Sequence, residues 1–198
     1  MKKTLLSAVL VLLFVFSPTL IYATVVNPPS NNYSFTMPGE WSEIPQGDIL
    51  IFAKKAAETL KIEPQEYTFG AHLTGRNYFE YPYLLVQEKS IPAMSYPELE
   101  KVFKIDTNDK ISNQFEGHME DLQISKPVLD KERNIIFITQ QADIGTVKMK
   151  GYTAIFIGKE QMVSLNFYST AEEYDKWIGD FTKTVNTFRF NPGMSMIH

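Results

Sequence analysis

The residues best suited to chemistry in this sequence are a histidine and the acids around it, in the segment 116–121 (Glu-Gly-His-Met-Glu-Asp). On a helix Glu116 and Glu120 share one face and His118 points away from both, so only an irregular helix end brings the three onto one metal ion. Carboxylates four residues apart at a solvated helix end explain the pattern without a metal. His118, Glu116 and Glu120 are therefore weak metal-site candidates, and we expect no metal and no other cofactor.

The remaining histidines lie outside any recognisable catalytic motif. His198 is the last residue, and His72 lies in a segment rich in aromatic residues. The sequence has no Gly-x-Ser-x-Gly nucleophile elbow, no glycine-rich phosphate loop, no His-Glu-x-x-His helix and no cysteine. We therefore predict a protein that is not an enzyme. The alternative is a hydrolase or metal-dependent enzyme with an unfamiliar site near His72 or His118.

Aromatic side chains crowd residues 54–82 and the position just after them. The six are Tyr67, Phe69, Tyr78, Phe79, Tyr81 and Tyr83. Rings on a loop give a large contact area at a small entropy cost, so these residues are the predicted surface for an unknown protein or small-molecule partner. The alternative is a strand around 67–73 and a loop whose rings cap a sheet edge. The segment is thus either a binding loop or a structural insertion.

The elements that must position these residues begin with a strand at 33–37, where apolar and polar residues alternate until Pro38-Gly39. Trp41 follows the turn, and the apolar run 49–53 predicts a second strand that forms a hairpin with the first. A further strand is expected over 84–88. Ser95 and Glu98 form a capping box, and the apolar spacing beyond them predicts one broken helix or two helices that reach Leu122.

The C-terminal part of the chain predicts consecutive antiparallel strands and a closing helix. Strands are expected over 127–129, 135–140, 152–157 and 163–167. Thr170 and Glu173 form a second capping box, so the helix should begin at Ala171. Its apolar face is formed by Tyr174, Trp177, Ile178, Phe181, Val185 and Phe188. The strand 152–157 is apolar on both sides, which favours a central strand with helices on both faces of the sheet.

The first residues resemble a secretory signal peptide. Lys2 and Lys3 precede an apolar run, and Pro18 with a terminal Ala23 favours cleavage after Ala23 over retention as a membrane anchor. We expect a signal peptide at 1–23, a linker or N-terminal arm at 24–32, one domain at 33–190 and a tail at 191–198. The protein should then be periplasmic or secreted, with no stable membrane insertion after cleavage. The alternative is a protein anchored by its uncleaved N-terminal helix.

Composition narrows the partners. The lack of cysteine excludes disulfides and a lipid anchor on a modified cysteine. Removing Lys2 and Lys3 from the 19 basic residues, against 23 acidic ones, moves the net charge from −4 to about −6. We therefore expect no binding to nucleic acid, because that requires a basic surface.

The order of these elements, with Tyr33-Ser34-Phe35, Pro38 to Trp41 and a final helix that ends in Thr187-Phe188-Arg189-Phe190, resembles the PsbP-like superfamily. That group includes the photosystem II extrinsic protein, the Ran-binding Mog family and periplasmic DcrB-like proteins. The resemblance covers about 33–190. It implies an α+β fold, a single-domain α/β/α sandwich whose antiparallel sheet of about six strands has helices on both faces. It also implies a non-enzymatic binding or assembly role, without ligand residues to transfer.

Overall fold

The computed structural model describes residues 23–93, 98 and 120–194. The strands are β1 (Thr24–Val26), β2 (Tyr33–Met37), β3 (Trp41–Glu43), β4 (Phe69–Leu73), β5 (Tyr83–Ser90), β6 (Glu120–Ile124), β7 (Val128–Asp130), β8 (Ile135–Ile144), β9 (Val147–Ile157), β10 (Gln161–Thr170) and β11 (Arg189–Phe190). The helices are α2 (Gln46–Leu60) and α5 (Tyr174–Thr187).

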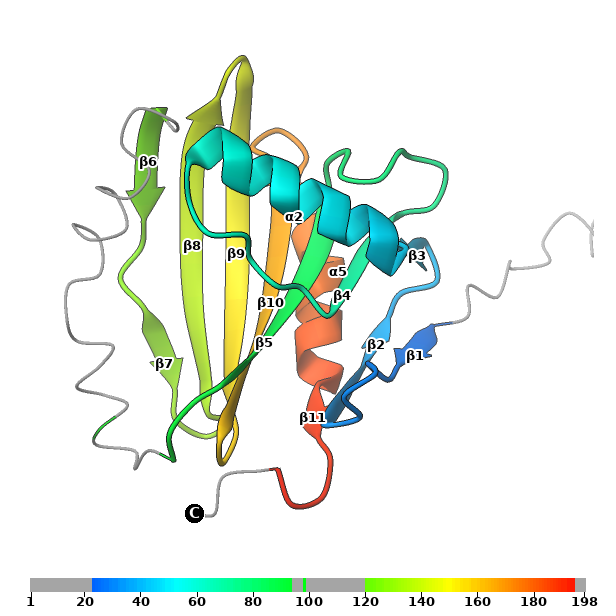
Figure 1. Ribbon diagram of the computed structural model, residues 1–198, viewed down its shortest axis with the longest axis vertical. Coiled ribbons are helices and arrows are strands. Elements are labelled where there is room, and N and C mark those ends of the chain that lie inside the picture. The colour runs from blue at the N-terminus through cyan, green and yellow to red at the C-terminus, as the bar shows by residue number, and fades with distance from the viewer. Residues whose placement is uncertain (1–22, 94–97, 99–119, 195–198) are drawn as a thin grey trace, which may run out of the picture.

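These strands form two antiparallel sheets. The main sheet has eight strands, seven in the order β3-β4-β5-β10-β9-β8-β6, with β7 also paired to β8 (Figure 1). The smaller sheet has the order β1-β2-β11. The predicted α+β fold with an antiparallel sheet is confirmed, and β9 is a central strand as expected. The predicted number of about six strands is too low, because β1, β3 and β11 are only two or three residues long and leave no periodic pattern in the sequence.

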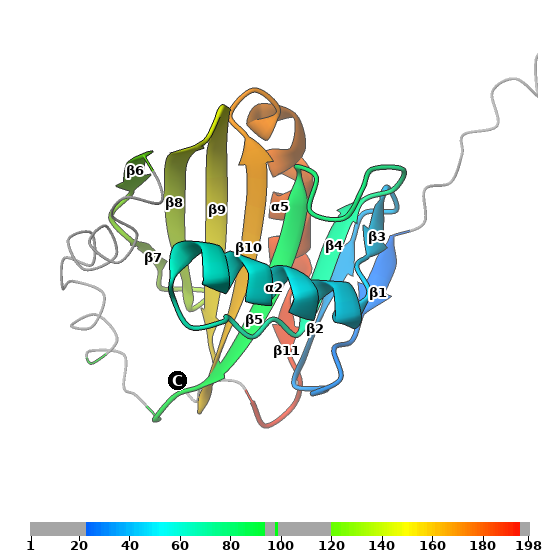
Figure 2. The ribbon, with the colours of Figure 1, turned by 45° about the horizontal axis from the view of Figure 1, so that its top comes forward.

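The core of the molecule lies between the main sheet, α5 and β2. Phe181 and Val185 of α5 are buried in one cluster with Phe35 of β2 and Phe167 of β10. Figure 2 shows α5 behind β10 and β5, with β2 next to it. The predicted sandwich requires a layer of helices on this face of the main sheet. The layer instead consists of α5 together with strand β2.

Helix α2 packs against a second set of side chains. Along strand β5 these alternate with the side chains that face the core. Ile49 joins a second cluster with Ile44, Tyr83 and Leu85, and α2 crosses in front of the sheet in Figure 1. The predicted strand at 49–53, and the hairpin built on it, are therefore wrong. The buried residues Ile49, Ala53 and Ala57 are four apart, which is a helical period, and the helix begins directly after Pro45.

Helix α5 confirms the predicted closing helix, with its start moved from Ala171 to Tyr174. Half of the capping box is formed, since the Thr170 hydroxyl accepts a hydrogen bond of 3.2 Å from the Glu173 amide. The Glu173 carboxylate binds Arg76 instead of returning to the cap. On the apolar face, Tyr174, Phe181, Val185 and Phe188 are buried, whereas Trp177 and Ile178 are half-buried.

Most of the helical region expected over 95–122 lies outside the described residues. Its end is described and differs from the prediction, because Leu122 lies in strand β6, which pairs with β8 along the sheet edge. The prediction placed Leu122 on a helix because the apolar residues before it in the sequence have a helical spacing that continues to Leu122. In the described part of the chain, no helix is both long and apolar enough to cross a membrane.

Candidate functional site

A groove of about 780 Å³ lies beside the N-terminal arm, and we call it the arm groove. One wall is the N-terminal arm, residues 24–30, which contains β1. The other wall is built from β3, the first turn of α2 and residues 66–71. The arm groove thus lies between the outermost strand of the small sheet and the outermost strand of the main sheet. Its volume falls in the range typical of ligand-binding clefts.

The arm is held at both of its ends. Strand β1 pairs with β2 in a register that places Val25 opposite Thr36. At the other end, the Asn32 side-chain amide donates a hydrogen bond of 2.6 Å to Glu88, and Asn191 donates one of 2.6 Å to the Asn31 carbonyl. The arm wall is therefore fixed to strands that belong to both sheets.

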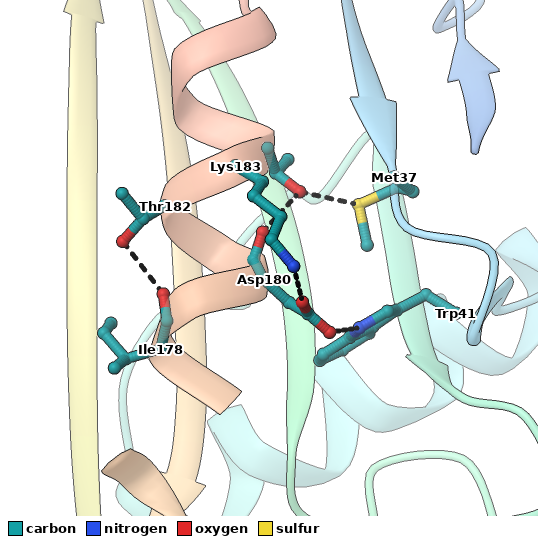
Figure 3. Close-up of polar contacts among 7 residues, drawn as sticks. Met37, Trp41, Ile178, Asp180, Thr182 and Lys183 are labelled. Atoms are coloured by element: carbon teal, nitrogen blue, oxygen red, sulfur yellow. Dashed lines mark hydrogen bonds and ion pairs between the residues drawn. The ribbon is translucent and has the colours of Figure 1, made fainter. Parts of the chain in front are cut away.

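The opposite wall is held to helix α5 and to α2. The Trp41 indole nitrogen donates to one carboxylate oxygen of Asp180 at 3.3 Å, and Lys183 binds the other at 2.9 Å (Figure 3). On the α2 side, the Gln46 side chain donates a hydrogen bond of 2.8 Å to the Tyr67 carbonyl. These contacts fix Trp41, Gln46 and Tyr67, which all line the arm groove.

The groove combines exposed apolar side chains with acidic ones. Val25 on the arm and Leu50 on α2 are 63% and 58% exposed, although both are large aliphatic residues. Glu43 and Glu66 are the charged residues in its lining, and none of the described residues that line it is basic. The site therefore offers apolar contact in a negatively charged setting.

The structure divides the six predicted aromatic residues among different surroundings. Phe69 is buried in the core, and it reaches the arm groove together with Tyr67. Tyr67, Phe79, Tyr81 and Tyr83 belong to the cluster beneath α2, where Phe79 stacks on Phe52 with ring centroids 4.0 Å apart. Tyr78 is 44% exposed, and its ring lies edge to face with that of His72, with the ring centroids 4.9 Å apart. A shared role of the six in binding a partner stays a prediction.

The tyrosine hydroxyls beneath α2 are poor acids. Burial raises the pKa values of Tyr67, Tyr81, Tyr83 and Tyr168 above the usual value of 10.0, and for Tyr67 a hydrogen bond with Tyr168 partly opposes that effect. At neutral pH these groups stay protonated, so they supply hydrogen bonds but no phenolate base or nucleophile. Their rings and hydroxyls fix the α2 side of the sheet.

The loop between β4 and β5 is tied down by Arg76. Its guanidinium binds both carboxylate oxygens of Glu173 at 2.8 Å and also donates to the Tyr81 carbonyl. The hydrogen bonds from Arg76 lower the pKa of Glu173. This loop carries Tyr78 and Phe79, so the ion pair holds part of the predicted aromatic surface against the start of α5.

The structure describes only part of the predicted histidine sites. His72 is buried in β4, and its Nδ1 has no hydrogen-bond partner among the described atoms. Within the described ranges, no cluster of three or more His, Cys, Asp or Glu residues could hold a metal ion. Glu116 and His118 lie outside those ranges, and of Glu120 only the backbone, at the start of β6, is described.

A second, smaller hollow of about 170 Å³ lies beneath the C-terminal half of α2. Small side chains of the helix, Ala53, Ala56 and Ala57, leave this space open above Tyr168 and Gln140. Its volume is close to that of a cavity that holds a single aromatic ring. It is separate from the arm groove except for Tyr67, which lines both.

Sequence reasoning missed the arm groove residues Val25, Gln46 and Leu50. Residues 24–32 were expected to be a linker or arm, and 49–53 a strand, so nothing placed Val25 near Leu50. The available signal was the four-residue spacing of Ile49, Ala53 and Ala57, which leaves Leu50 on the outer side of a helix.

Comparison with known proteins relates the chain by fold. No family model and no curated protein matches the sequence. The structure is similar to the cyanobacterial PsbP (CyanoP) of Synechocystis, with a TM-score of 0.59 and 10% identity over 88% of this chain and 96% of that one. It is also similar to LpqN of Mycobacterium tuberculosis, with a TM-score of 0.52 and 10% identity over 86% of this chain and 91% of that one. The chain therefore has a PsbP-like fold, as its element order and motifs predicted.

Proposed function

We propose that this protein is a secreted or periplasmic binding or assembly factor that holds a partner without chemical turnover, and that the arm groove is its binding site. The observation that carries the proposal is the groove itself, about 780 Å³ in volume, with the exposed Leu50 of α2 in its lining. An exposed aliphatic side chain in a preformed cleft gains free energy when a ligand covers it.

The chemistry of the described residues supports binding over catalysis. The buried tyrosines are protonated at neutral pH, and His72 lies in the sheet with its Nδ1 unpaired. The arm groove itself contains carboxylates, amides and hydroxyls but neither histidine nor lysine among the described residues of its lining. Such a set can orient a ligand through hydrogen bonds.

Two observations support a location outside the cytoplasm. The sequence begins with a predicted signal peptide at 1–23. LpqN, which has a similar fold, is involved in cell envelope biogenesis in Mycobacterium tuberculosis. An assembly or envelope-related role is the extension of that similarity to this chain.

The experiment is affinity purification of the protein from its own secretory compartment, with partners quantified by mass spectrometry. Leu50→Asp places a charge in the groove, whereas Ile51→Asp changes a neighbouring residue of α2 that is 64% exposed and does not line the groove. We expect Leu50→Asp to lose a partner that the Ile51→Asp control retains. Equal recovery of every partner by both variants would remove the arm groove as the binding site.

A further inference from the structure

We propose that the ligand of the arm groove is an extended peptide segment of a partner protein, with apolar residues and flanking Lys or Arg residues, which adds as a strand beside β1. This inference rests on the proposed function and names the chemistry of the partner. It follows from the strand edges, the apolar side chains and the charges at the groove.

The first argument is the position of two sheet edges. Strand β1 is the last strand of the small sheet, and β3 is the last strand of the main sheet, so among the described strands each has a partner on one side only. Both line the arm groove. A sheet edge presents backbone N–H and C=O groups that an incoming strand can pair with, and peptide recognition by added strands uses this property.

The length of β1 limits the segment that can pair. Three residues at about 3.3 Å each give a paired length of roughly 10 Å. The pairing core of the ligand is therefore about three residues, and its flanks reach the groove ends. Because β1 is held by β2 and by the Asn31 and Asn32 contacts, it offers this edge in a fixed position.

The second argument concerns the side chains that the segment meets. Val26 of β1 and Leu50 of α2 both line the groove, and Leu50 is 58% exposed. In an extended strand, alternate side chains point to opposite faces. One set of apolar side chains can then contact Leu50, while main-chain pairing with β1 places the segment in register.

The third argument is charge. Glu43 and Glu66 line the groove, and none of its described lining residues is basic. Complementary charges flanking an apolar segment raise the association rate and reject acidic competitors. The same acidity disfavours a second copy of this chain as the ligand, because the chain carries a net charge of −4 and would bring its own carboxylates to the contact.

The test is selection from a random heptapeptide library displayed on phage, using the full secreted protein, with Leu50→Asp protein for counter-selection. We expect enriched peptides to combine apolar residues with Lys or Arg and to lack proline in the paired core. They should bind wild-type protein at least about tenfold more tightly than Leu50→Asp, and Ile51→Asp within about twofold of wild type. Their affinity should fall when salt rises from about 0.05 to 0.5 M.

Several outcomes overturn the inference. Enrichment of acidic or uncharged peptides, equal binding to Leu50→Asp, or no enrichment at all contradicts it. Self-association of the protein that Leu50→Asp abolishes would make a second copy the ligand. If one of these results accompanies a partner that is lost from Leu50→Asp in the affinity purification, the groove still binds, and only the peptide chemistry is wrong. If no partner depends on Leu50 either, the proposed function fails as well.

Discussion

Arg76 and Glu173 form a bidentate ion pair with two nitrogen–oxygen distances of 2.8 Å. The pair joins the loop between β4 and β5 to the start of α5. The residues are 97 positions apart in the sequence. The pair uses the carboxylate that the sequence pattern assigned to a helix cap. It holds the loop that carries Tyr78 and Phe79.

Glu173→Gln tests this ion pair through the pH dependence of stability. We expect a loss of about 0.5 to 1 kcal/mol in the free energy of unfolding near pH 7, because the pair is partly exposed to solvent. Hydrogen bonds from Arg76 lower the pKa of Glu173 in the folded state below its usual value of 4.5. The stabilisation is therefore complete above about pH 4.5 and disappears as the pH falls through the lowered pKa.

Urea unfolding of wild type and variant across this pH range is the measurement. Glu172→Gln, which changes the exposed neighbouring acid, is the control and should leave stability nearly unchanged. A difference between wild type and Glu173→Gln that stays constant at low pH would contradict an ionic origin.

Phe181→Ala should be the most damaging change on α5. Phe181 is 3% exposed. The centroid of its ring lies 5.4 Å from that of Phe167 and 5.3 Å from that of Tyr152. Truncation leaves a cavity that costs about 3 to 5 kcal/mol. Trp177→Ala should cost less than about 3 kcal/mol, because Trp177 is only half-buried. If denaturant melts show that Trp177→Ala is more destabilising than Phe181→Ala, this assignment of the buried face of α5 is wrong.

Two glycine substitutions should change stability in opposite directions. At Gly70, an added Cβ would lie 3.0 Å from Ile49 of α2 and 3.1 Å from Leu85 of β5. Gly70→Ala should therefore cost about 1 to 3 kcal/mol by overpacking the contact between α2 and the sheet. Gly179 lies inside α5 with open space around it, so Gly179→Ala should stabilise by about 0.5 to 1 kcal/mol. Thermal melts of both variants measure the signs. A neutral Gly70→Ala would mean that α2 does not press on β4.

The long strands and the closing helix were predictable because their side chains keep one period over many residues. Val163, Leu165 and Phe167 alternate along β10, and all three are buried as expected. The stripe on α5 likewise follows a helical period. Such patterns reflect one continuous contact with the core, so a local window is enough to read them.

The run at 49–53 misled the prediction because five apolar residues stand together while only part of the run faces the core. Ile49 and Ala53 are buried, whereas Leu50 and Ile51 face outward. A purely structural helix would carry polar residues at those outward positions. The departure from the expected pattern at Leu50 therefore coincides with the candidate site.

The crowding of aromatic residues did not predict their placement either. Tyr83 of β5 pairs with His72 of β4, which lies three residues from Phe69. Neighbouring residues of a strand point to opposite faces, so Phe69 enters the core while Tyr83 packs beneath α2. The arm groove depends on the pairing of β1 with β2 and on the approach of α2 to residues 66–71. Those contacts join distant parts of the chain, and no local pattern encodes them.

The most direct test of the central claim, that the arm groove holds a partner, is site-specific photocrosslinking in the native compartment. A photoreactive amino acid is placed at Leu50 in one strain and at the equally exposed Ile51 in another. We predict a discrete adduct with a partner protein from position 50 that position 51 does not give. Identical adduct patterns from the two positions, or no adduct from position 50, would contradict the claim.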